Sequence, residues 1–201
     1  MKLFLAVLTV LSLAGCAAAP RVEYPALSWP QRAAQLGALQ DWELRGRVAL
    51  QTDDNRGGQA ALHWRHDGER HTLVLRGPLG GGWLRLQQDR DGAHLQDAER
   101  RDYRAASAEE TLFAATGWRM PLSGLEYWIR GIPAPGDVAR QDWDERGRLA
   151  RLQQFGWDVR FIDYLTSGTY ELPSRLDLIL PALDRQARAE ARIVVEEWVL
   201  K

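Results

Sequence analysis

The chain contains one cysteine, Cys16, so its 201 residues cannot form an internal disulfide. Cys16 follows Leu13-Ala14-Gly15, and ahead of these residues lie the cationic Lys2 and an apolar run from Leu3 to Leu13. A charged start, an apolar segment and small residues before a cleavage point are typical of an export signal. The apolar run is too short to cross a bilayer as a permanent helix. We therefore expect residues 1–15 to be a signal peptide.

The Leu-Ala-Gly-Cys tetrapeptide resembles the signal of bacterial lipoproteins. The resemblance implies that the Cys16 thiol receives diacylglycerol, that cleavage occurs before Cys16, and that the new amine is acylated. Several acyl chains would fix the protein to a membrane, because each buried methylene contributes about 0.8 kcal/mol. Ala17, where an aspartate would signal retention, implies sorting to the outer membrane under the rule known for enterobacterial lipoproteins. The alternative is an ordinary signal peptide with a chance cysteine.

Several classes of chemistry are excluded by the remaining residue types. Lysine occurs only at positions 2 and 201, so a phosphate-binding Walker A loop and a Schiff-base lysine are not expected. His63 and His66, three residues apart on a predicted strand, point to opposite faces, so we expect no metal site. No serine has a Gly-x-Ser-x-Gly setting, and no carboxylate pair stands out. We expect no enzyme and no cofactor beyond the lipids on Cys16.

Charge and composition describe an ordinary folded domain. The formal net charge is -1, which gives no basic field for nucleic acid, and 45% of the residues are hydrophobic. The length favours one domain, and we expect a monomer. Nine tryptophans provide a large, rigid apolar contact area, as in a cavity for greasy ligands.

A glycine-rich loop, Gly77 to Trp83, is the second informative segment. Such loops can cradle phosphate, but here the following helix and the lysine are both missing. One interpretation is a wide hairpin in which Leu79, between Pro78 and Gly80, happens to be apolar. The other is a flexible loop that holds Leu79 in water. That exposure forgoes about 1.5–3 kcal/mol, which insertion into lipid would recover. Trp83 is a second candidate for membrane contact.

The residue pattern predicts strands, then helices, then strands again. Residues 16–28 form an Ala/Pro-rich tether, and 29–39 a short helix. Alternating apolar residues between 42 and 96 indicate about six short antiparallel strands. Ser107 and Glu110 form a capping-box pattern at the start of a helix that ends before Gly117. The remaining predicted elements are a helix at 122–130 and strands near 139–143, 149–156, 157–165, 175–180 and 189–199.

About ten or eleven strands cannot form a flat open sheet, because exposed edges and twist are costly. We expect a barrel or half-barrel with the helices over one mouth and room inside for a small ligand. The strand residues expected to point inward are Val48, Leu62, Trp64, Leu73, Leu75, Leu84 and Leu86. The apolar residues expected on the helical lid are Leu112, Phe113, Leu125 and Trp128.

The motifs resemble the LolB family, the outer-membrane lipoprotein receptors of the lipoprotein localisation pathway. The similarity covers the mature chain, and Pro121 to Pro133 is its most specific segment. The other matching segments are Leu13 to Cys16, Trp42 to Ala49, Gly77 to Gly80, Ala108 to Trp118 and Trp198. The Gly80-Gly81-Gly82 run departs from the family and would make this loop unusually flexible.

The resemblance implies a mainly β fold with a helical insert: an incomplete antiparallel barrel of about eleven strands with a helical lid, here residues 29–201. It further implies a receptor that faces the periplasm, takes lipoproteins from a LolA-like carrier and inserts them into outer-membrane lipid. Their acyl chains would occupy the cavity without nucleotide hydrolysis, and Leu79 would act at the membrane. Two alternatives remain, a structural or assembly lipoprotein without a transfer role and an enzyme on a similar half-barrel.

Overall fold

A computed structural model describes residues 27–53, 57–78, 82–182 and 188–201. Cys16, the predicted signal peptide, most of the predicted tether, and Leu79 and Gly80 lie outside the described residues. The boundaries predicted for the signal peptide and the tether therefore stay predictions.

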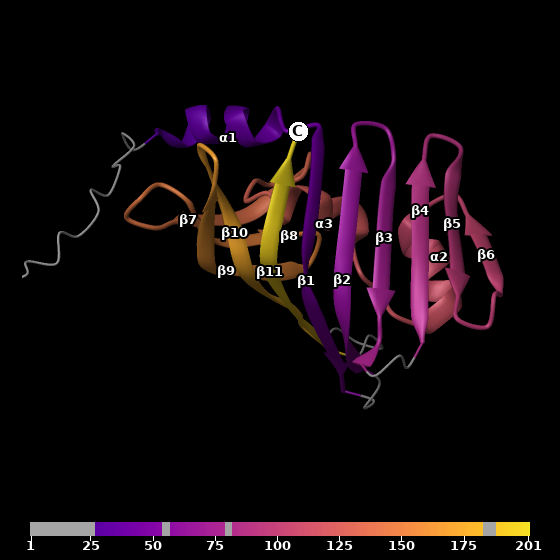
Figure 1. Cartoon of the computed structure of the whole chain (residues 1–201). Coiled ribbons are helices and arrows are strands. Elements are labelled where there is room, and N and C mark those ends of the chain that lie inside the picture. The colour runs from indigo at the N-terminus through magenta and orange to yellow at the C-terminus, as the bar shows by residue number, and fades with distance from the viewer. Residues whose placement is uncertain (1–26, 54–56, 79–81, 183–187) are drawn as a thin grey trace, which may run out of the picture.

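The described chain forms one eleven-stranded antiparallel sheet that curves strongly without closing (Figure 1). The strand order is β6-β5-β4-β3-β2-β1-β11-β10-β9-β8-β7, so β6 and β7 are the two free edges. This confirms the predicted incomplete barrel of about eleven strands. The strands are β1 (Asp41–Thr52), β2 (Gly57–Asp67), β3 (His71–Arg76), β4 (Trp83–Asp89), β5 (Gly92–Asp97), β6 (Asp102–Ala105), β7 (Val138–Trp143), β8 (Leu149–Gln154), β9 (Trp157–Ser167), β10 (Tyr170–Leu180) and β11 (Ala189–Leu200).

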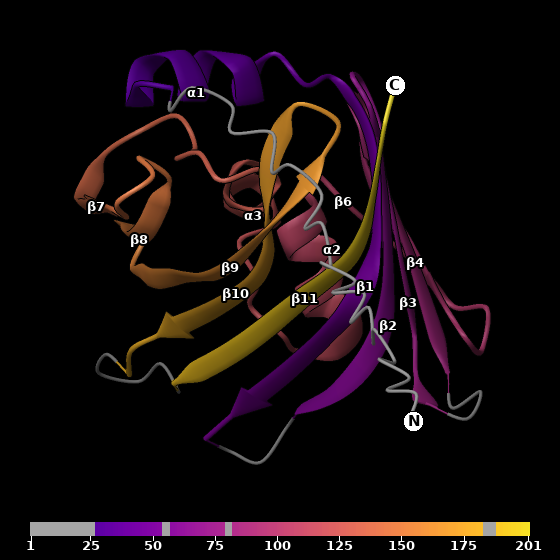
Figure 2. The same cartoon turned by 60° about the vertical axis from the view of Figure 1, so that its left-hand side comes forward.

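Three helices accompany the sheet in the described residues: α1 (Trp29–Gly37), α2 (Ala108–Thr116) and α3 (Leu122–Trp128). Figure 2 shows α2 and α3 inside the curve of the sheet, whereas α1 runs across one end of the strands. The predicted limits of α2 are confirmed, since the Ser107 hydroxyl accepts from the Glu110 amide and Gly117 is left-handed with φ 74°. No helix among the described residues is long and apolar enough to span a bilayer.

The core lies on the inner face of the curved sheet. Trp42 on β1 is central to it and makes edge-on contacts with Trp64 and Trp198, at ring separations of 5.3 and 5.4 Å. Such aromatic pairs contribute about 0.5–1.5 kcal/mol beyond the area they bury. The strand alternation predicted from the sequence is confirmed along β1, where Trp42, Leu44 and Leu50 are buried.

One strand limit differs from expectation, because β10 begins at Tyr170 rather than near Arg175. Pro173 lies inside this strand, although proline lacks the amide that a sheet requires. The register between β9 and β10 shifts directly after Pro173, so the proline sits at a β-bulge. A bulge allows a longer strand than the proline suggests.

A second register shift lies in β1, between Arg45 and Gly46, where the strand pairs with β11. A Cβ atom on Gly46 would collide with the carbonyl oxygen of Val194. Only glycine therefore allows the two backbones to approach this closely.

We expect Gly46→Ala to lower the free energy of unfolding by about 1–3 kcal/mol, the usual effect of overpacking. Chemical denaturation measures the change. Gly58→Ala is the matched control, because a Cβ at Gly58 meets no atom within 4 Å. Equal stabilities of the two variants would show that β1 and β11 can separate at the bulge without cost.

Candidate functional site: an apolar cavity under two helices

The curved sheet and the two inner helices enclose an apolar cavity of about 370 Å³. This volume lies within the 300–1,000 Å³ range of small-molecule sites. Strands β1 to β4 form its wall, and α2, α3 and the segment between them form its cover. The lining is dominated by leucine side chains and also includes tryptophan and methionine.

Most residues predicted for the cavity do line it. Leu75 and Leu84 face each other across the β3–β4 pairing, as do Leu73 and Leu86, so both pairs project from the same face. The period-2 geometry of strands explains why sequence parity located them. The predicted residues that line the cavity are Val48, Leu62, Trp64, Leu73, Leu75, Leu84, Leu86, Leu112 and Leu125.

Phe113 and Trp128 lie on the two cover helices, as predicted, but neither side chain lines the cavity. Phe113 is 42% exposed on the outer side of α2, with the guanidinium of Arg119 over its ring. Successive helical residues are about 100° apart, which turns Phe113 away when Leu112 points inward. Trp128 is fully buried, but it lies on the side of α3 that faces β8, where its Nε1 donates to Gln154 at 2.9 Å.

A hydrogen bond joins the two helices of the cover. A carboxylate oxygen of Glu109, on α2, accepts from the Ser123 amide at the start of α3, at 2.6 Å. This amide would otherwise be one of the unpaired donors of the helix start. The bond places Leu112 of α2 and Leu125 of α3 over the same cavity. The two helices therefore act as one cover.

Sequence reasoning missed several lining residues. Trp118 and Met120 lie in the irregular segment between α2 and α3, where no periodicity marks an inward side. Pro78, Gly82 and Trp83 line the cavity where β3 leaves the sheet and β4 returns to it. The Gly77 amide donates to the Gly82 carbonyl at 3.0 Å and closes this loop at its base. The glycine-rich segment thus begins and ends at the cavity, and Trp83 contributes to its lining.

Three charged residues, Asp97, Glu99 and Arg101, form a polar rim on the otherwise apolar cavity. The Asp97 carboxylate accepts hydrogen bonds from the backbone amides of Glu99 and Arg101. It also accepts one from the guanidinium of Arg101, at 2.7 Å. Burial raises the pKa of Asp97, but the hydrogen bonds and charge of Arg101 outweigh burial, and its pKa is lowered. The rim is therefore charged at neutral pH, and it offers a polar end to an amphiphilic ligand.

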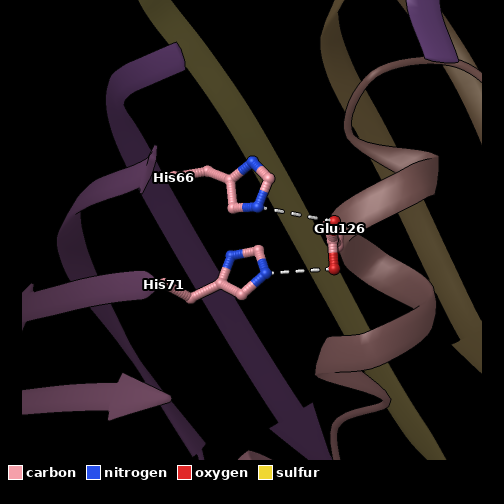
Figure 3. A group of neighbouring side chains, drawn as sticks. All are labelled: His66, His71 and Glu126. Carbon is pink, nitrogen blue, oxygen red and sulfur yellow. Dashed lines mark ion pairs between the residues drawn. The ribbon is translucent and has the colours of Figure 1, made fainter. Parts of the chain in front are cut away.

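A cluster of His66, His71 and Glu126 at one end of the cover was also missed by sequence reasoning (Figure 3). His66 and His71 are paired across the β2–β3 hairpin, and Glu126 approaches both from α3. The signal in the sequence was the four-residue turn at 67–70, which places positions 66 and 71 opposite each other. Within the described residues, these three side chains form the one group with enough ligand atoms for a metal ion. His63 points to the other face, as predicted, and contacts Glu43.

Comparison with known proteins gives consistent similarities over nearly the full length. The family model for the outer membrane lipoprotein LolB matches residues 40–198. A protein named outer-membrane lipoprotein LolB from Alkalilimnicola ehrlichii is 38% identical, covering 99% of this chain and 97% of that protein. Proteins of the same name from Nitrosococcus oceani and Pseudomonas aeruginosa are 33% and 34% identical; they cover 99% and 98% of this chain, and 98% and 96% of their own lengths.

Among solved structures, a LolA superfamily protein from Nitrosomonas europaea aligns with a TM-score of 0.53 and 8% sequence identity. The alignment covers 88% of this chain and 94% of that protein. At this identity the similarity supports the fold, in agreement with the open eleven-stranded sheet. The sequence matches, which extend over the cavity and its cover, establish that this chain belongs to the outer membrane lipoprotein LolB family.

Proposed function

We propose that this protein receives lipoproteins from a periplasmic LolA-like carrier and inserts them into the outer membrane. In this proposal the cavity binds the acyl chains of the cargo, and Cys16, acylated, anchors the protein to the outer membrane on its periplasmic side. The names of the relatives support the outer-membrane lipoprotein part of the proposal.

The observation that best supports the proposal is the apolar cavity beneath α2 and α3. Inward leucines on adjacent strands, such as Leu73, Leu75, Leu84 and Leu86, provide a continuous apolar wall. Each methylene that moves from water to such a wall contributes about 0.8 kcal/mol. An acyl chain gains much of its affinity this way, without any directional contact, so the site suits many cargo proteins.

The charged rim supports an amphiphile as the occupant rather than a purely apolar molecule. Arg101 bonds to Asp97 through Nε, but its side chain stays largely exposed, so the rim still offers guanidinium donors beside the cavity. The ester and amide groups of a lipidated cysteine require such partners when they leave water. We therefore expect acyl chains under the helices and the polar linkage at the rim.

Transfer by this route requires no nucleotide, provided each successive site binds the acyl chains more tightly. The carrier would hold them least tightly, the cavity more tightly and the bilayer most tightly. Binding free energies of this kind need differ by only about 1.4 kcal/mol per tenfold preference. The affinity of such a receptor for acyl chains therefore depends on the volume of its cavity and on how easily the chains can enter it.

The proposal is tested by crosslinking a lipoprotein from the carrier to defined positions of the lipidated protein. A photoreactive residue at Leu84, inside the cavity, is expected to crosslink cargo within the time of transfer and without ATP. The matched control is the same residue at Arg85, which is adjacent on β4 and exposed. Equal crosslinking at both positions, or none at Leu84 while transfer continues, would contradict acyl-chain binding in the cavity. Absence of any transfer from the carrier would favour an assembly role.

A further inference from the structure

In the His66–His71–Glu126 cluster, the carboxylate of Glu126 on the cover contacts two histidines of the sheet. One Glu126 oxygen, Oε2, lies 3.0 Å from His71 Nε2, and the other, Oε1, lies 3.9 Å from His66 Nε2 and 3.7 Å from an Arg130 nitrogen. Figure 3 shows both rings directed at Glu126 from the hairpin side. A second nitrogen of Arg130 donates to the carbonyls of Leu36 and Leu39, at 3.3 and 3.0 Å. Glu126 and Arg130 together thus link β2, β3, α3 and the end of α1.

The geometry disfavours a metal ion, although the ligand types would suit one. The two rings are stacked, with centroids 4.2 Å apart and planes 15° apart, so their nitrogen lone pairs run parallel and do not converge. The indole nitrogen of Trp64 donates to His71 Nδ1 at 3.3 Å. A neutral ring that accepts at Nδ1 carries its proton at Nε2, the atom that faces Glu126. His71 is therefore a hydrogen-bond donor to the carboxylate, and Arg130 supplies the positive charge.

The burial of the cluster and the charges around it disfavour protonation of His66. Burial is the largest cause that lowers the pKa of His66; the neighbouring His71 and Arg130 lower it further, and Glu126 and Asp67 act in the opposite direction. Burial raises the pKa of Glu126, but His71, His66 and Arg130 together lower it. His66 Nδ1 is buried without a hydrogen-bond partner. A proton on His66 would therefore add a second buried cation beside Arg130, with one carboxylate, Glu126, to balance two positive groups.

The cluster is directly connected to the cavity. Trp64, which bonds to His71, lines the cavity, and so do Leu122 and Leu125, which precede Glu126 on α3. A smaller cavity beside the cluster is lined by His71, Glu126, Trp64 and Leu122. Any outward movement of α3 must therefore separate Glu126 from His71. The cavity of about 370 Å³ is small for a ligand with several acyl chains, which such a movement would accommodate.

We propose that Glu126 is a positioning residue that fixes α3 over the cavity through His71 and Arg130, and that protonation of His66 releases it. This inference rests on the proposed function, because the cavity is taken to bind acyl chains. The sign follows from linkage: the closed state excludes a proton that the open state accepts, so the open state gains population as the pH falls. The gain begins below about pH 6.5, the ordinary range of histidine, and is absent above it.

The test measures the dissociation rate of a fluorescent diacylglycerol from the purified mature protein between about pH 5 and pH 8. We expect the wild-type rate to rise several-fold below about pH 6.5. Glu126→Gln is expected to release the lipid rapidly at every pH, because the charged partner of His71 and Arg130 is lost. His66→Phe keeps the stacked ring but cannot be protonated, so its release is expected to stay slow at every pH.

Opposite effects of the two variants distinguish positioning from simple damage to the fold, which would accelerate release in both. His94→Gln is the control, since it removes another histidine–carboxylate pair, with Asp102, on the sheet away from the cover. It should keep the wild-type pH profile. A wild-type profile in His66→Phe, or a wild-type rate in Glu126→Gln, would overturn the inference. So would stabilisation by added Zn²⁺ that His66→Phe abolishes, because it would identify a metal site.

Hydrogen exchange of the α3 amides gives a second measurement that needs no lipid. We expect faster exchange in residues 122–128 below about pH 6.5 in the wild type, after correction for intrinsic rates, and a flat profile in His66→Phe. If the protein binds no diacylglycerol yet shows this profile, the proposed function fails and the role of Glu126 stands. If lipid binds and α3 exchange is independent of His66, the proposed function stands and the role of Glu126 fails.

Discussion

Replacing Leu84 by Asp is expected to weaken acyl-chain binding by more than tenfold while leaving the protein folded. Leu84 lines the cavity opposite Leu75, and both side chains are only half-buried. A carboxylate there can stay hydrated until a ligand enters, so the cost falls on binding. If two methylenes lose their apolar contact, the loss is about 1.6 kcal/mol at 0.8 kcal/mol each, and 1.4 kcal/mol is tenfold in affinity.

Titration with a neutral fluorescent diacylglycerol measures the effect, since a neutral probe avoids charge repulsion with the new carboxylate. Val74→Asp is the matched control, because Val74 pairs with Arg85 on the other face of the same two strands. We expect it to bind the probe like the wild type. Circular dichroism and thermal unfolding establish that both variants fold. Equal affinities in the two variants would show that lipid does not enter between β3 and β4.

The strands and their inward residues could be predicted because the side-chain period of a strand is two. Once Trp42 and Leu44 were assigned to the inner face, alternation placed Leu62, Trp64, Leu73 and their neighbours on the same side, and the structure agrees. The limits of α2 followed equally from local chemistry at Ser107 and Gly117. These features are specified by residues close together in the sequence.

The rotation of the short helices could not be predicted in the same way. Helices of nine and seven residues contain too few apolar positions to define one face, so the sequence did not show that Phe113 and Trp128 turn away from the cavity. The fold places Trp128 by a distant partner, Gln154 on β8, with which it forms a buried hydrogen bond. Glu126 is a similar case, because its contacts with His66 and His71 depend on how α3 crosses the hairpin.

Replacing Leu79 by Glu is expected to leave acyl-chain uptake unchanged and to block delivery into the membrane. Leu79 lies outside the described residues, so this expectation rests on the sequence and on membership of the family. The flanking residues support it, because Pro78 and Gly82 line the cavity and the loop between them begins and ends there. An apolar side chain in this loop would lose about 1.5–3 kcal/mol in water and recover it in lipid. A charged carboxylate gains no free energy by entering lipid, so we expect delivery to fall by at least tenfold.

Two separate measurements distinguish uptake from delivery: transfer of a lipoprotein from the carrier to the variant, and its subsequent transfer to outer-membrane lipid vesicles. Leu79→Met, which keeps an apolar side chain, is the control and should deliver cargo at close to the wild-type rate. Leu84→Asp should show the reverse defect, with uptake lost before delivery can begin. Normal delivery by Leu79→Glu would remove the loop from the mechanism. The cavity and its cover would then have to release cargo to the bilayer unaided.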